Sequence, residues 1–501
     1  MNFLRTVTIH PLFLTMNILL SITYFTCVAF FFPIGNPVLF GLLIAAEIYH
    51  LWQVAGYLHS IWPRKRERTF DMRIDDEVAI FITVCGEPKD IVEATLKAVL
   101  KIKYAGDFNV YLLNDGKVAN RPNWREAEEL AKKYKVGVFT REVPGGAKAG
   151  NINNALKQTT EPYFVVFDAD HIPKKHFLSA MMGYFADERV AFVQSPQYYK
   201  NFDDNIVTGG AWEQQELFFG AIMKGKDTTN SAFMCGTNMV LRRTALDEVG
   251  GMSEFSIAED FLTSLLVHEK GWKSVYVSEV LAEGLAPEDF LSYYKQQFRW
   301  TRGSLEVVFK YNPLFRKGLT WNQRIQYLAS ASFYVSGLVV ALNALLPLLY
   351  FYTGLEPLRI STMLLALIFL PYLIITLYTL QLSSNYSFTF RALSYSVSSF
   401  PLHIKAVWHI LTGRKTGFVV TSKRAIAGSN GRLVAPHLVY IALVVIGVGY
   451  AIVREGPSAS ILSNAAWSLV YIAIFIPFIA AAFYKPVIAD GITPEFEATA
   501  K

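Results

Sequence analysis

Apolar residues gather in long stretches at both ends of this sequence, and a segment of mixed polarity separates the two groups. The early stretches are Pro11–Phe32 and Val38–Tyr57, each close to the ~20 residues that cross about 30 Å of hydrocarbon. The later stretches are Ala329–Tyr352, Ile360–Leu382, Val434–Val453 and Ala459–Tyr484. With 52% hydrophobic residues, the chain is predicted to be a membrane protein with six transmembrane helices and a water-soluble part.

Basic residues near these stretches predict on which side of the membrane the loops lie. The second stretch is followed by "WPRKRER", and the loop from Thr412 to Arg432 is also rich in lysine and arginine. Because cytoplasmic loops carry the excess of basic residues, we expect both segments and both termini in the cytoplasm of a multi-pass plasma membrane protein. A signal peptide is the alternative for the first stretch, but its apolar run is too long and a second one follows directly.

The segment Arg391–Leu411 interrupts its apolar residues with arginine, lysine and histidine. This pattern favours a helix that lies in the membrane interface. A seventh span there is the alternative, and it would move the C-terminus to the other side of the membrane.

Charge and cysteine content exclude several classes of protein. The formal net charge of +6 is too small to indicate a nucleic-acid partner. Cys27, Cys85 and Cys235 have no paired spacing, which argues against a disulfide framework or a zinc site and fits a reduced compartment.

Between Asp75 and about Pro313, short β-rich runs alternate with helical patterns. The runs "VAIFITV", "FNVYLLNDG", "VGVFT" and "YFVVFDAD" are separated by helical segments such as "KDIVEATLKAVLKI" and "WREAEELAKKY". Alternation of this kind predicts βαβ units on a mostly parallel sheet. Ligands of such sheets bind beyond the carboxyl ends of the strands.

Polar residues stand at three of these strand ends. Thr83 and Glu87 follow the first strand, Asp115 follows the second, and Asp168 and Asp170 end "VVFDAD". Two carboxylates one residue apart suit a hard dication such as Mg²⁺. The alternatives are a solvated turn for the aspartate pair and an Asp-Gly turn for Asp115.

No glycine-rich phosphate loop is present, so phosphate charge would have to be met by a metal ion and basic side chains such as Lys148. Further along come "FMCGT", the pair Glu259–Asp260, and an amphipathic stretch that contains "QQFRW". The acidic pair also suits a helix N-terminus, and Trp300 also suits an interfacial anchor.

In this order, the motifs resemble those of the processive inverting family-two glycosyltransferases of membranes, and most closely the cellulose synthases. The resemblance covers nearly the whole chain and implies a GT-A-like α/β domain inserted between transmembrane helices. It implies domains at 1–68 (two membrane helices), 69–286 (cytosolic catalytic domain), 287–325 (amphipathic interface helices), 326–485 (channel region with a gating loop at 412–433) and 486–501 (short cytosolic tail). The segment "FVVTSK" resembles the gating loop of cellulose synthases, which hyaluronan and chitin synthases are not expected to share.

The resemblance also implies roles for individual residues. Asp168 and Asp170 would hold Mg²⁺ or Mn²⁺ on the diphosphate of a UDP-sugar, with UDP-glucose as the expected donor. Asp260, paired with Glu259, would be the general base that activates the growing polysaccharide, and one displacement would give a β-linkage. Substrate would be bound by Thr83, Glu87, Asp115, Lys148, Cys235, Gly236, Thr237, Gln296, Arg299, Trp300, Phe418, Thr421 and Lys423.

Two departures from the family pattern leave other products open. The threonine of the "TED"-type motif is Ala258, and "FFCGT" has become "FMCGT".

The sequence after Lys485 is too short for a cyclic-dinucleotide domain, so regulation by that messenger is not expected. The alternatives are hyaluronan or chitin, a β-1,3 or mixed-linkage glucan, transfer of one sugar to a lipid, or a non-enzymatic scaffold or carrier.

Overall fold

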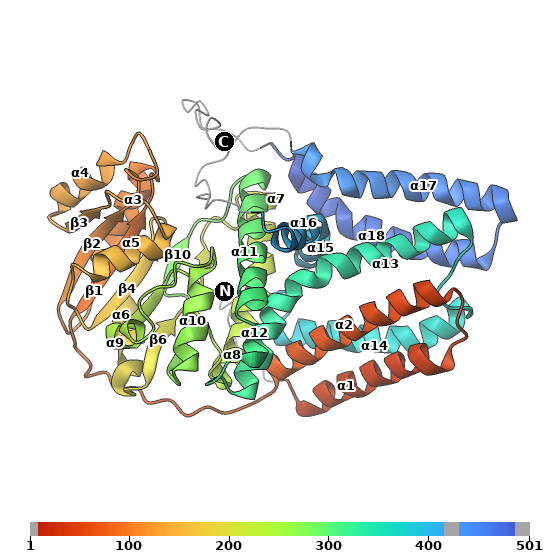
Figure 1. Ribbon diagram of the computed structural model, residues 1–501, viewed down its shortest axis with the longest axis horizontal. Helices are drawn as coiled ribbons and strands as arrows, with labels where there is room; N and C mark the ends of the chain where they lie inside the picture. Colours follow the sequence, from red (N-terminus) through yellow and green to blue (C-terminus); the bar gives the residue numbers. More distant parts are fainter. Residues whose placement is uncertain (1–8, 415–429, 486–501) are drawn as a thin grey trace.

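The computed structural model describes residues 9–414 and 430–485. Figure 1 shows an α/β domain at one end of the molecule and a bundle of long helices at the other. Helices that run across the long axis separate the two parts.

The α/β domain is built on a seven-stranded sheet with strand order β3-β2-β1-β4-β8-β6-β9. Its strands are β1 (Val78–Val84), β2 (Phe108–Asn114), β3 (Gly137–Thr140), β4 (Tyr163–Asp168), β6 (Val190–Gln194), β8 (Met239–Arg242) and β9 (Lys273–Tyr276). Neighbouring strands are parallel except at β8, which is antiparallel to β4 and β6. The mostly parallel sheet predicted from the sequence is therefore confirmed.

A small second sheet has the order β5-β10-β7. Its strands are β5 (Ile172–Pro173), β7 (Tyr198–Tyr199) and β10 (Ala282–Gly284). The strand β5 follows the aspartate pair of β4 within a few residues, so this sheet fixes the chain just beyond the candidate metal site.

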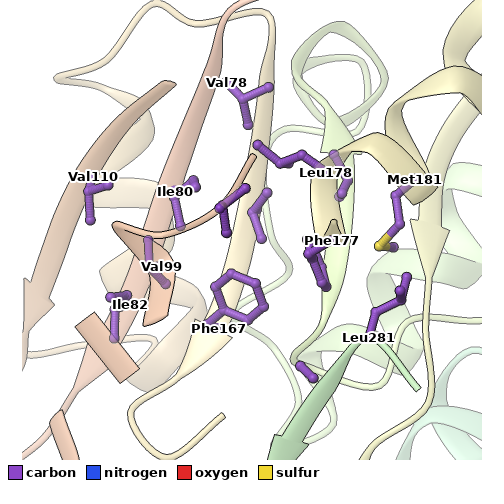
Figure 2. Packing of buried hydrophobic residues seen from close by; sticks show 14 of the residues in the cluster. Val78, Ile80, Ile82, Val99, Val110, Phe167, Phe177, Leu178, Met181 and Leu281 are labelled. Atoms are coloured by element: carbon purple, nitrogen blue, oxygen red, sulfur yellow. The ribbon is translucent and has the colours of Figure 1, made fainter. Parts of the chain in front are cut away.

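Two hydrophobic clusters cover the faces of the large sheet, because successive side chains of a strand point to opposite faces. Val78, Ile80 and Ile82 of β1 belong to one cluster, which is seen in Figure 2, while Phe81 belongs to the other. Helices of this domain are α3 (Lys89–Val99), α4 (Arg125–Tyr134), α5 (Ala147–Leu156), α6 (Phe177–Met181), η2 (Met182–Ala186), α9 (Arg243–Asp247) and α10 (Glu259–Glu269).

The strand order reverses direction between β1 and β4. The chain proceeds from β1 outward to β2 and β3 and then returns to place β4 on the other side of β1. In open α/β sheets, the crevice at such a reversal is where ligands bind. The register pairs Thr83 with Asp168, so the two polar strand ends are neighbours.

Six helices are long and apolar enough to cross a membrane, counted over the described residues. They run over Pro11–Phe31, Pro37–Ile61, Trp321–Thr353, Thr362–Ser383, Gly431–Glu455 and Ala459–Phe483. Their elements are α1 (Pro11–Thr26), η1 (Cys27–Phe31), α2 (Pro37–Ile61), α12 (Trp321–Ser332), η5 (Phe333–Val335), α13 (Ser336–Thr353), α14 (Thr362–Ser383), η6 (Gly431–Val434), α17 (Ala435–Glu455) and α18 (Ala459–Phe483). The predicted number of spans is confirmed, with α2 reaching four residues past the predicted end.

Shorter helices lie between the sheet and the bundle. They are α7 (Ile206–Leu217), η3 (Phe218–Ile222), α8 (Met223–Thr228), α11 (Phe290–Lys310), η4 (Pro313–Phe315), α15 (Phe390–Ser398) and α16 (Phe400–Leu411). Figure 1 shows α11 at a steep angle to the long helices of the bundle. The segment Arg391–Leu411 is divided between α15 and α16, and neither helix is long enough to span a membrane.

Close packing joins these short helices to the bundle. A hydrophobic cluster combines Trp212 of α7, Phe290 and Tyr293 of α11, Tyr395 of α15 and Phe478 of α18. A Cβ atom at Gly225 of α8 would lie 1.7 Å from the Ser60 carbonyl oxygen of α2, so only glycine permits this approach. The α/β domain is thus held directly against the helix bundle.

Candidate functional site

The carboxyl ends of β1 and β4 bring the first polar residues together. The Thr83 hydroxyl donates to the Phe167 carbonyl oxygen at 3.3 Å and lies 3.4 Å from a carboxylate oxygen of Asp168. The Asp168 backbone N–H donates to the Thr237 hydroxyl at 2.9 Å. Thr237 is buried, and its predicted role in binding substrate stays a prediction.

Lys148 of α5 provides a positive charge at the same place. Its ammonium group forms an ion pair with Asp168 and donates to the Gly236 carbonyl oxygen at 2.7 Å. A lysine fixed between a strand-end carboxylate and the "FMCGT" loop is well placed to meet an anionic ligand.

Asp168, Asp170 and His171 each offer a ligand atom, and the three atoms all lie within 4.8 Å of one another. A carboxylate oxygen of Asp170 accepts the Leu285 N–H at 3.0 Å, and the other lies 3.5 Å from Nδ1 of His171. The His171 ring is buried, and neither of its nitrogens has a hydrogen-bond partner among the described residues. Two carboxylates and one uncommitted imidazole fit a divalent cation.

His171 was not predicted from the sequence as a site residue. The signal that could have identified it is its position directly after Asp170, at the start of the short β5 sheet. A Cβ atom at Gly284 of β10 would lie 2.5 Å from the His171 ring, so that glycine leaves the imidazole its space.

Asp115 is the second strand-end carboxylate, and the structure gives it a partner that sequence analysis missed. Arg141 donates to both of its carboxylate oxygens at 2.6 Å. Burial raises the pKa of Asp115, whereas the hydrogen bonds and charge of Arg141 act in the opposite direction. Nothing in the motif around Arg141 distinguishes it from a surface arginine, because the pairing depends on the fold.

Glu87 lies in the turn after β1. One of its carboxylate oxygens accepts the Cys85 N–H at 2.5 Å, which closes the turn. Burial raises the pKa of the Cys85 thiol to about 11, with the charges of Glu87 and Asp115 adding to the effect. Cys85 is therefore a neutral side chain in this wall of the site.

Glu259 and Asp260 occupy the first turn of α10, opposite the strand ends. The Gly236 backbone lies against Asp260, since a Cβ atom there would be 3.1 Å from a carboxylate oxygen. Burial raises the pKa of Asp260, while the Phe261 N–H, Lys148 and Arg299 oppose this rise. Burial and the charge of Asp260 raise the pKa of Glu259 to about 7.

The helix α11 supplies Gln296, Arg299 and Trp300 to the site. The positive charge of Arg299 partly opposes the rise in pKa of both acidic residues of α10. A Cβ atom at Gly303 would lie 2.7 Å from that of Ala258, so α11 is packed tightly against the start of α10.

One cavity of about 800 Å³ connects these groups. Of the predicted site residues, it is lined by Thr83, Glu87, Asp115, Lys148, Asp168, Asp170, Cys235, Gly236, Glu259, Asp260, Gln296, Arg299 and Trp300. Phe418, Thr421 and Lys423 lie outside the described residues. Its lining continues into the helix bundle through Asn17 of α1, Tyr57 of α2, Ser330 of α12, and Thr376 and Leu380 of α14.

Comparisons with known proteins agree with this geometry. A family model described as glycosyltransferase like family 2 matches residues 76–303, and one described as cellulose synthase matches residues 247–433. A cellulose synthase catalytic subunit [UDP-forming] from Pseudomonas fluorescens is 31% identical over 453 residues, which are 85% of this chain and 60% of the relative. Another from Xanthomonas axonopodis pv. citri is 37% identical over 310 residues, 59% of this chain and 41% of the relative.

The chain thus spans about 60% or less of the length of these two curated relatives. Among solved structures, a mannosyltransferase from Pyrobaculum calidifontis in complex with GDP-Man and Mn²⁺ aligns with a TM-score of 0.52. At 15% identity, over 75% of this chain and 100% of that one, this similarity concerns the fold alone.

Proposed function

The chain belongs to the family-two glycosyltransferases and contains a cellulose synthase region, and on this premise we propose that it is a processive, inverting hexosyltransferase. In this proposal it builds a β-linked glucan from UDP-glucose. Polymerisation takes place on the cytosolic face of the plasma membrane, and the growing chain leaves through the enzyme's own membrane helices.

The observation that carries the proposal is the single cavity shared by the two parts of the molecule. Its lining includes Asp168, Asp170 and Asp260 of the α/β domain and also Asn17 and Thr376 of the membrane helices. A transferase that moved one sugar to a soluble acceptor would need no cavity that continues into the helix bundle. An enzyme that extends a polymer and passes it into the membrane would need this continuous cavity.

The donor would bind at the strand ends. Asp168, Asp170 and His171 would hold Mg²⁺ or Mn²⁺, which supplies positive charge to the diphosphate as the nucleotide departs. Lys148, which is paired with Asp168 in the structure, would turn part of its charge to the same diphosphate when the donor binds. The UDP-forming relatives support a UDP-sugar as the donor.

Asp260 would act as the general base. The acceptor hydroxyl gives its proton to the Asp260 carboxylate while its oxygen attacks the anomeric carbon, and the bond from that carbon to UDP breaks. Since the attack comes from the face opposite UDP, the configuration inverts and a β-linkage results. Arg299 would keep this carboxylate ionised in spite of its burial.

The acceptor end would lie along α11. Trp300 lines the cavity, and its ring would stack on the terminal sugar. Tyr57 and Ser330 are hydroxyl-bearing residues in the part of the lining that belongs to the helix bundle. The loop that contains Phe418, Thr421 and Lys423 remains a predicted gate.

The proposal is tested with purified full-length protein, UDP-[¹⁴C]glucose and Mn²⁺. Labelled material that is retained as long polymer and digested by cellulase is the expected product. Digestion only by hyaluronidase or chitinase after supply of the corresponding donors, or formation of a labelled lipid, would replace the proposed product with one of those alternatives. Omission of the metal should stop UDP release.

A further inference from the structure

A patch of basic and aromatic side chains lies where α2 ends and α12 begins, outside the large cavity. We call it the boundary patch, and it consists of Arg64, Lys65, Phe315, Lys317, Trp321 and Arg324. Both helices belong to candidate membrane spans, and their junction lies at the border between the α/β domain and the helix bundle (Figure 1).

The contacts of α2 with α12 place these residues together. The Ser60 hydroxyl donates to the Gln326 side chain at 2.9 Å, and a Cβ atom at Gly56 would lie 3.0 Å from that of Ala329. The two helices are therefore antiparallel here, because residue number rises along one as it falls along the other. Residues that follow Ile61 consequently lie beside the first turn of α12.

Arg324 ties the preceding loop to the same place. Its guanidinium donates to the carbonyl oxygens of Leu314 at 2.5 Å and of Arg316 at 2.8 Å. The same guanidinium lies over the Trp321 ring, 5.1 Å from its centre. The backbone at Leu314 and Arg316, on either side of Phe315, is thereby fixed to the first turn of α12.

Two large aromatic side chains of the patch are exposed. Phe315 is 82% exposed and Trp321 is 71% exposed. Trp321 is also the first residue of its candidate span. An exposed aromatic residue at a span end is typical of the membrane interface, where one side of the ring meets lipid and the other meets water.

The positive charge of the patch is not neutralised by carboxylates. Across residues 9–414 and 430–485, none of Arg64, Lys65, Lys317 and Arg324 forms an ion pair with an acidic side chain. Arg316, by contrast, is bound to Glu269. Arg64 donates to the His59 carbonyl oxygen at 2.6 Å, which fixes its position without cancelling its charge.

The N-terminus of α12 adds to this positive potential. Its backbone N–H groups point toward the patch, and a helix of 12 residues carries about half a positive charge at that end. Thr320 and Gln323 cap the first turn reciprocally, so the helix begins at a defined position. Among residues 62–70, which follow α2 directly, Glu67 is the one acidic residue, and it is exposed.

We propose that the boundary patch is a binding site for anionic phospholipid headgroups of the leaflet that faces the α/β domain. Lys65 and Lys317 would contact the phosphate, while Phe315 and Trp321 would enter the region between headgroups and acyl chains. The site lies at the ends of two spans, the level at which headgroups occur, and this favours lipid over a soluble anion. The inference rests on the six spans crossing a bilayer and not on the transfer reaction.

The test compares lipid binding to full-length protein in detergent by native mass spectrometry, with POPG and POPC as probes. Wild-type protein should bind POPG more tightly than POPC. Lys65→Gln/Lys317→Gln should weaken POPG binding about 30-fold, because each basic residue near an anionic surface contributes ~1 kcal/mol and 1.4 kcal/mol is tenfold. Both lysines are exposed and unpaired in the described structure, so their replacement should not impair folding.

The matched control is Lys101→Gln/Lys132→Gln, which removes two exposed charges of the α/β domain, one just after α3 and one in α4. It should bind POPG as wild-type does. A second measurement uses brominated lipids, with the Trp321 signal obtained as the difference between wild-type and Trp321→Phe. Brominated POPG should quench that signal more strongly than brominated POPC. Equal binding of the two lipids by wild-type, or equal POPG binding by the patch and control variants, would overturn the proposal.

Discussion

Replacing Asp260 with asparagine tests the assignment of the general base. Asparagine has the same shape, and its side-chain oxygen can still accept the Phe261 N–H, which Asp260 accepts at 2.7 Å. The strand-end groups, including the ion pair of Lys148 with Asp168, need not move. Only the capacity to take up a proton is lost.

The expected loss follows from that single role. A positioned general base contributes about 10²–10⁴-fold to the rate, which corresponds to ~2.7–5.5 kcal/mol in the barrier. Stability should not fall, because burial raises the pKa of Asp260 and therefore opposes its ionised form in the folded protein. A neutral side chain removes that cost.

The assay combines three measurements on purified protein. UDP release gives the turnover rate, calorimetric titration with UDP gives donor-site affinity, and thermal unfolding gives Tm. Asp260→Asn should lose about 10²–10⁴-fold in turnover, with unchanged UDP affinity and a Tm that is not lowered. Asp247→Asn is the control, since Asp247 is exposed in α9, and it should behave as wild-type. Wild-type turnover in Asp260→Asn would refute the role of this residue.

Three further predictions concern the other parts of the site. Asp170→Asn should abolish Mn²⁺-dependent UDP binding while leaving metal-free UDP binding in place, which titration with and without EDTA measures. Arg141→Met should lower the free energy of unfolding by about 3–5 kcal/mol, because it leaves the buried Asp115 carboxylate without its cation, and chemical denaturation checks this. Burial raises the pKa of Asp260, so its carboxylate should take up a proton at a pH above the ordinary aspartate value near 3.9. As the solution is acidified, turnover should therefore begin to fall above that value. A pH profile whose acid limb lies below that range would contradict this placement of the base.

The large-scale organisation could be predicted from the sequence because its signals are local. Apolar length determines the six spans, and alternation of strand and helix patterns determines the parallel part of the sheet. The strand β8 escaped prediction, since its insertion between β4 and β6 depends on pairing over long sequence distances. The interface helices α7 and α8 escaped it too, because their apolar residues face both the domain and the bundle.

The candidate site was predictable where chemistry is concentrated in a short motif. Asp168 and Asp170 follow one buried strand, so their spacing singles them out. Glu259 and Asp260 begin one helix, where acidic residues are common in any case, and only the resemblance of their motif to the family gave them a role. The Arg141 partner of Asp115 comes from a different strand end, and its role arises from three-dimensional proximity. For His171 the decisive facts are its burial and two ring nitrogens without a hydrogen-bond partner among the described residues, which no spacing rule reports.

The link between the donor site and the membrane helices is the central claim, and Thr376 of α14 provides its most direct test. Thr376 lines the cavity, whereas Lys132 of α4 is exposed on the α/β domain and is not part of the cavity lining. The measurement is the rate at which a water-soluble maleimide modifies Thr376→Cys or Lys132→Cys, followed by peptide mass spectrometry, before and after synthesis from UDP-glucose. The account predicts that synthesis protects Thr376→Cys, that cellulase treatment restores its reactivity, and that Lys132→Cys does not change. Unchanged modification of Thr376→Cys in protein that has made polymer would contradict a path for the product between these helices.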